Sequence, residues 1–132
     1  MIGRRVGCLV LWGLTASASV LAHHSLAGVY DMRKEAEGSG SLVSIKFTNP
    51  HGSLTLAVKN ADGSTTEWVM TTGSATTLAE RGIGRNTNGL KPGDAITVKY
   101  LPARNGSPLG FLKSITLPDG RVIQISLGNA ND

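Results

Sequence analysis

Residues 41–59, SLVSIKFTNPHGSLTLAVK, contain two short apolar segments on either side of a turn. Apolar side chains recur at positions 42, 45 and 47 and again at 54, 56 and 58, close to the two-residue period of a β-strand. Between them lies Asn49-Pro50-His51-Gly52, whose composition is typical of a turn. We therefore expect the domain to begin with two strands that this turn connects.

The rest of the chain continues this alternation of apolar segments and turns. Asp62-Gly63 suits a tight hairpin before a third strand that contains Trp68 and Met70. Ser74–Arg81 instead has the capping serine and apolar stripe of one short helix. Further strands are expected at Ala95–Leu101, Gly110–Leu117 and Val122–Ile125. This order predicts an all-β fold, a small OB-like barrel of about five to six antiparallel strands with one short helix; a β-sandwich fragment is the alternative.

The N-terminal segment has the order of a secretory signal peptide. Two arginines, Arg4 and Arg5, precede an apolar run at residues 6–14 and a stretch of small residues. The run is shorter than the roughly 20 apolar residues of a membrane span, which argues against a retained anchor. The residues around the arginines fit a twin-arginine signal poorly, so we expect Sec-type export and a periplasmic or secreted protein.

Cleavage after Ala22 would leave a signal peptide of residues 1–22 and a single β-barrel domain of residues 23–132. A cut after Ala18 is the alternative, and the spacing of small residues alone does not decide between the two. The only cysteine, Cys8, lies in the signal, so the mature domain has no disulfide and depends on packing for its stability. We expect no stable membrane insertion after cleavage.

Composition and motifs argue against several classes of function. The chain has 13 basic and 9 acidic residues, and loss of two arginines with the signal leaves 11 against 9, a net charge of +2. This charge is too small to argue for nucleic-acid binding. The sequence lacks the G-x-S-x-G, Walker, H-E-x-x-H and dinucleotide motifs, and its acidic residues stand singly between strands. We therefore expect no enzyme and no catalytic residues, but an exported binding or accessory protein.

The three histidines of the sequence occur at two places, His23-His24 at the expected mature N-terminus and His51 in the turn. Imidazole is a common ligand of copper and zinc. Cleavage just before the pair would give His23 a free α-amine that chelates with its own imidazole, and His51 would complete a three-nitrogen site. Without a thiol, such a site suits Cu(II), with Zn(II) as the second choice. The predicted metal ligands are therefore His23, His24 and His51, with Asn49 supporting them and Pro50 stiffening the turn.

Two arguments weigh against this metal site. An N-terminal histidine pair is often only a solvated tail. If residues 26–30 pair back onto the first strand, His23 would lie opposite Ile45. At about 3.3 Å per residue, it would then be roughly 20 Å from His51, and only a strongly coiled strand or a bulge would close the gap.

The competing class is a metal-free interaction module that binds a protein, an envelope glycan or a small ligand on the barrel face. Aromatic side chains would supply such a platform, as in OB domains on which ligands stack. Single aromatic residues more often pack in the core or at its rim. The aromatic residues in question are Tyr30, Phe47, Trp68, Tyr100 and Phe111.

Several short motifs occur in the order seen in a known family. They are Ala22-His23-His24-Ser25, Tyr30-Asp31, Thr48-Asn49-Pro50-His51, Glu67-Trp68, Leu90-Lys91-Pro92-Gly93-Asp94 and Ser114–Arg121. On these residues the chain resembles the DUF6152 family of small exported bacterial proteins of unknown function, over almost the whole mature chain. The resemblance implies a mature N-terminus at the histidine pair, which favours cleavage after Ala22. It implies no established activity.

Overall fold

The computed structural model describes residues 26–84 and 89–126, which contain one six-stranded sheet and short helices. The named elements are β1 (Ala36–Lys46), β2 (Ser53–Lys59), β3 (Thr65–Thr71), α2 (Ala75–Glu80), β4 (Ala95–Pro102), β5 (Leu109–Thr116) and β6 (Val122–Gln124). The predicted strands and helix are confirmed. None of the helices in the two described ranges has the length and apolar character needed to cross a membrane. The predicted signal peptide, residues 1–22, lies outside the described residues.

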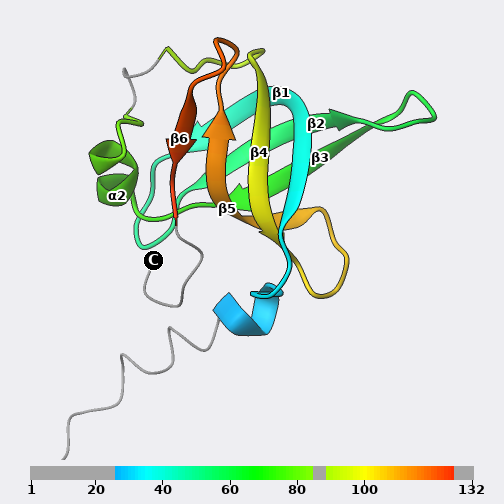
Figure 1. Cartoon of the computed structure of the whole chain (residues 1–132), viewed down its shortest axis with the longest axis horizontal. Helices are drawn as coiled ribbons and strands as arrows, with labels where there is room; N and C mark the ends of the chain where they lie inside the picture. Colours follow the sequence, from blue (N-terminus) through cyan, green and yellow to red (C-terminus); the bar gives the residue numbers. More distant parts are fainter. Residues whose placement is uncertain (1–25, 85–88, 127–132) are drawn as a thin grey trace, which may run out of the picture.

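The sheet closes into a five-stranded barrel, and β6 is added outside the ring (Figure 1). Neighbouring strands follow the order β3-β2-β1-β4-β5-β6, and β3 also pairs with β5. The OB-like barrel is therefore confirmed, but the expectation of antiparallel strands throughout is wrong at this closing pair, which is parallel. The reason is geometric. A closed ring with an odd number of strands cannot alternate in direction at every joint, so one neighbouring pair must run parallel.

The long strand β1 pairs with a different neighbour along each part of its length. Residues 36–41 pair with β4, and residues 41–46 pair with β2. A register shift between Leu42 and Ser44 helps the strand bend from one part of the barrel wall to the next. A Cβ at Gly40 would lie 2.3 Å from the carbonyl oxygen of Ala57 in β2. The two backbones therefore approach too closely at this point for any side chain.

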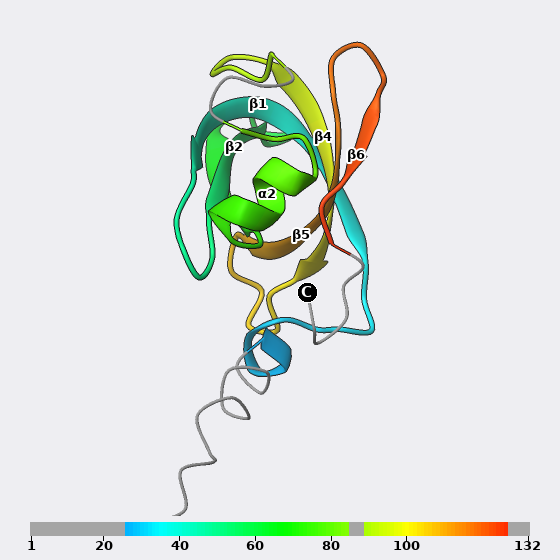
Figure 2. The same cartoon turned by 90° about the vertical axis from the view of Figure 1, so that its left-hand side faces the viewer.

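Helix α2 covers one opening of the barrel, as Figure 2 shows. The predicted cap is confirmed, because Ser74 Oγ accepts a hydrogen bond from the backbone N–H of Thr77 at 3.1 Å. Leu78 points from the helix into the core and is 1% exposed. The short helix is thus held by its cap and by one buried side chain.

The barrel interior is filled by apolar side chains that alternate inward from the strands. Its fully buried members include Leu54, Leu56, Met70, Val98, Leu112, Ile115 and Ile125. Toward the β2–β3 hairpin, the rings of Trp68 and Tyr100 pack together with their centroids 5.6 Å apart. The barrel interior is apolar, so most polar side chains lie in the turns and on the outer face of the sheet.

The close approach of β1 and β2 gives a stability prediction. We expect Gly40→Ala to lower the free energy of unfolding by about 1–3 kcal/mol, because the new methyl group must push the two strands apart. Gly38→Ala is the matched control, since its Cβ would meet only the Tyr100 ring at 3.6 Å, an ordinary contact. Urea unfolding of both variants measures the difference. Equal stability of the two would contradict the close approach.

Candidate functional site

His51 lies in an exposed turn that hydrogen bonds hold in place. The turn connects β1 to β2 and contains a cis peptide bond between Asn49 and Pro50. Thr48 Oγ1 donates to the carbonyl oxygen of His51 at 2.7 Å, and Asn49 Oδ1 accepts from the backbone N–H of Ala75 at 3.1 Å. The predicted turn is confirmed. The oxygen of Asn49 is used to fix the turn to the start of α2, and His51 is exposed.

The other two predicted metal ligands, His23 and His24, lie outside the described residues. Within residues 26–84 and 89–126, no three histidine, cysteine, aspartate or glutamate side chains are grouped so that they would hold a metal ion. A site formed by all three histidines therefore stays a prediction.

The first described segment packs outside the barrel ring, beside β4 and β5, as a strap, which we define as residues 26–34. Residues 26–29 form a helical turn, and Tyr30 then makes an antiparallel bridge with Ala103. The strap is therefore bonded to the loop between β4 and β5. Residues 26–30 do not form a hairpin with the first strand. Their backbone groups are hydrogen-bonded instead to the end of β4 and the loop that follows it.

The side chain of Tyr30 anchors the strap to the sheet. Tyr30 is 4% exposed, and its ring packs against that of Phe111 with the ring centroids 5.7 Å apart. Its hydroxyl is hydrogen-bonded to Thr71 Oγ1 at 2.7 Å. Thr71 is the ladder partner of Ser53, which follows His51 by two residues. The strap is thus fixed to the same ends of β2 and β3 that border the His51 turn.

Asp31 holds the next part of the strap. Its backbone N–H donates to the carbonyl oxygen of Pro102 at 2.9 Å, and its buried carboxylate accepts from the backbone N–H of Arg33 at 3.2 Å. The ammonium of Lys34 lies 3.7 Å from the other carboxylate oxygen. The hydrogen bond from Arg33 is the main cause that lowers the pKa of Asp31, and burial partly opposes it. The strap therefore favours the charged carboxylate.

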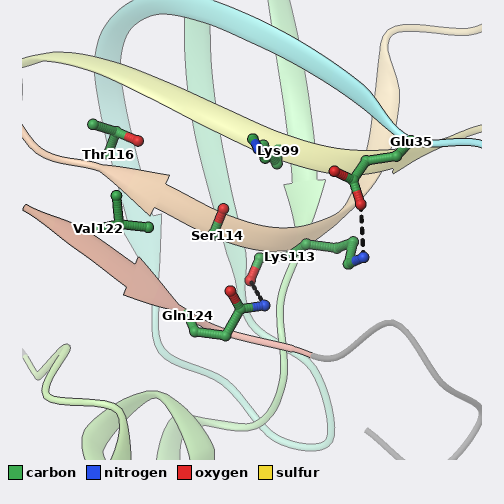
Figure 3. Close-up of a pocket in the computed structure, with 7 residues that line it drawn as sticks. All are labelled: Glu35, Lys99, Lys113, Ser114, Thr116, Val122 and Gln124. Atoms are coloured by element: carbon green, nitrogen blue, oxygen red, sulfur yellow. Dashed lines mark hydrogen bonds and ion pairs between the residues drawn. The ribbon is translucent and has the colours of Figure 1, made fainter.

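A polar groove lies on the outer face of β4, β5 and β6 (Figure 3). Its volume is about 360 Å³, and it is lined by Glu35, Lys99, Lys113, Ser114, Thr116, Val122 and Gln124. One row of paired residues crosses the three strands, from Lys99 through Ser114 to Gln124. The groove depends on β6, because this strand extends the sheet beyond the barrel.

An ion pair closes one side of the polar groove. Lys113 Nζ donates to Glu35 Oε2 at 2.7 Å, and the Lys113 side chain is only 23% exposed. This hydrogen bond and the positive charge of Lys113 lower the pKa of Glu35. The lowered pKa keeps Glu35 charged at neutral pH, and the ion pair holds its carboxylate in position.

Sequence reasoning missed the polar groove, although the strands carry a signal for it. Polar residues recur at alternate positions, at 97 and 99 in β4 and at 114 and 116 in β5. Such alternation indicates one solvated face. It does not say which strands are neighbours or which residues stand side by side, so the groove follows only from the pairing.

The aromatic residues do not form one platform. Trp68 and Tyr100 pack inside the barrel, whereas Tyr30 of the strap packs on Phe111 in a separate cluster. Phe47 is half-buried against the main core. The interpretation of these residues as core packing is confirmed, and a shared stacking face is not formed.

Comparison with protein families gives one match. A family model described as a family of unknown function, DUF6152, matches residues 13–112. No curated protein and no solved structure matches the chain. The family match confirms the resemblance carried by the sequence motifs. It ends one residue before Lys113, so most residues of the polar groove lie beyond the matched range.

The strap carboxylate gives a pH prediction. The folded state lowers the pKa of Asp31 below its ordinary value of 3.8, so its contribution to stability is complete above this value and is lost as the pH falls through the lower, folded pKa. We expect Asp31→Asn to be less stable than the parent at neutral pH and to lose less stability between about pH 4 and pH 2. Urea unfolding at a series of pH values measures both effects. Parallel stability curves for parent and variant would contradict the prediction.

Proposed function

The chain belongs to the DUF6152 family, and on this premise we propose that it is an exported binding protein for Cu(II). The proposed ligands are His23, His24 and His51, and Zn(II) is the second choice of metal. A Sec-type signal peptide of residues 1–22 would direct the protein to the periplasm or the medium. Its removal would create the α-amine that the metal site uses.

The anchored strap is the observation that supports this proposal most directly. Tyr30 is hydrogen-bonded to Thr71, beside Ser53, and His23 precedes Tyr30 by seven residues. Residues 26–29 are helical and rise only about 1.5 Å each, so with three further residues at about 3.3 Å each the path from Tyr30 to His23 is up to about 16 Å long. We propose that this path brings the histidine pair to His51. The hairpin that would have kept these groups roughly 20 Å apart is replaced by the strap.

The proposed ligands have the chemistry that Cu(II) prefers. The α-amine and imidazole of His23 would form a chelate ring, and His51 would add a third nitrogen from a turn that is already fixed in place. Asn49 would act indirectly, because its oxygen holds the turn to Ala75. Protons compete with the metal for the ligand nitrogens, so acid would weaken the binding.

A copper titration of the processed protein tests the proposal. The parent protein, shown by intact mass to begin at His23, is compared with His51→Ala and with a variant that carries three extra glycines before His23, so that no histidine stands third in the chain. We expect both changes to weaken Cu(II) binding by at least about tenfold, because each removes one nitrogen ligand. Lys59→Gln, at an exposed position at the end of β2, is the control and should bind as the parent does.

The possible results separate the competing interpretations. Loss of binding in both variants supports one site that contains the α-amine and His51. Equal binding in all three proteins would mean that the N-terminal tail binds copper without His51, and the proposed site would be wrong. No binding in the parent leaves the metal-free interaction module, for which the polar groove is a separate argument.

A further inference from the structure

The floor of the polar groove contains the hydroxyl of Ser114, which is open to solvent. Ser114 is 5% exposed, and its side chain makes no hydrogen bond within the part of the chain that the structure describes. Figure 3 shows this hydroxyl directed into the groove between Lys99 and Gln124, its paired neighbours on β4 and β6. Because Ser114 Oγ is open to the groove, a ligand that lies there can form a hydrogen bond with it, either as donor or as acceptor.

Gln124 adds a fixed acceptor to the groove. Its Nε2 donates to the carbonyl oxygen of Lys113 at 3.1 Å and also to that of Ser126. Both hydrogens of the amide are thus used by the backbone, and the amide oxygen faces the groove as Figure 3 shows. Glu35 contributes a second acceptor, because only one of its carboxylate oxygens is bonded to Lys113. The ligand must therefore bring hydrogen-bond donors to this side.

Lys99 leaves the lining of the groove with a net positive charge, although it also interacts electrostatically with Glu35. The lining contains two amines and one carboxylate, and Lys113 is already paired with Glu35. Lys99 makes no ion pair within residues 26–84 and 89–126, although Glu37 is its ladder partner on β1. An anionic group on the ligand would meet this ammonium and the neighbouring Ser114 hydroxyl together.

These groups define one class of ligand. The ligand would place an anionic group beside Lys99 and hydroxyl donors beside Gln124 and Glu35. Val122 is the one apolar side chain of the lining, so the ligand is mainly polar. We propose that the polar groove binds a sugar acid, a polyhydroxylated ring that carries a carboxylate. A volume of about 360 Å³ lies at the lower end of the range for small-molecule sites and is suited to one such ring.

Nuclear magnetic resonance of the full mature domain tests this proposal without copper. D-glucuronate is titrated into labelled protein, with D-glucose as the probe without a carboxylate and acetate as the probe without hydroxyls. We expect saturable shifts of backbone amides in β4, β5 and β6 with glucuronate, and at least about tenfold weaker binding of the other two. Methyl β-D-glucuronide, which mimics the end of a glycan chain, distinguishes a free sugar acid from a chain-terminal one.

Matched variants locate the ligand. Lys99→Gln should weaken glucuronate binding by about tenfold or more, and Ser114→Ala by about three- to tenfold. Lys59→Gln removes the same charge from an exposed position on the hairpin and should leave the affinity unchanged. Spectra with the dispersion of the parent show that each variant is folded.

Three results would contradict the proposal. If glucose bound as tightly as glucuronate, Lys99 would not recognise a carboxylate. If Lys99→Gln and Lys59→Gln lost the same affinity for glucuronate, the effect would be one of general surface charge. The absence of saturable shifts with every probe would overturn the proposal. None of these outcomes depends on the histidines, so failure here and failure of the copper site are distinguishable.

Discussion

The double pairing of β1 is the constraint on which the rest of the structure depends. One half of this strand bonds to β4 and the other half to β2, and the backbone at Gly40 comes so close to Ala57 that a side chain would not fit. This sharp bend brings the two parts of the sheet round until β3 meets β5. With the ring closed, apolar side chains fill the inside, and α2 covers one opening.

Closure of the barrel also determines where polar side chains can gather on its surface. Because the interior is packed with apolar groups, the side chains of the two proposed sites lie in a turn and on the outer face. Strand β6 lies outside the ring and extends the wall formed by β4 and β5, which creates the polar groove around Ser114. The His51 turn is held instead by its bonds to the start of α2. The two regions are built by different elements, so the two proposals stand on separate observations.

The strap changes the argument about the N-terminal histidines. A hairpin of residues 26–30 onto the first strand would have kept the histidines apart, but Tyr30 bridges Ala103 and bonds to Thr71 instead. A local pattern could not reveal this, because both partners lie far away in the sequence and become neighbours only when the barrel closes. The strap thereby joins the start of the described chain to the strand ends that border His51.

The sequence by itself determined the elements and the class of fold. Apolar periodicity and turn residues predicted the strands, the helix with its Ser74 cap and the OB-like barrel, and the DUF6152 motifs predicted the family. These features are local, so they can be read from neighbouring residues. Only the tertiary structure decided the parallel closing pair, the path of the strap and the row from Lys99 through Ser114 to Gln124. Each of these depends on strand order and register, and a shift of one residue in register would turn every side chain of a strand to the opposite face.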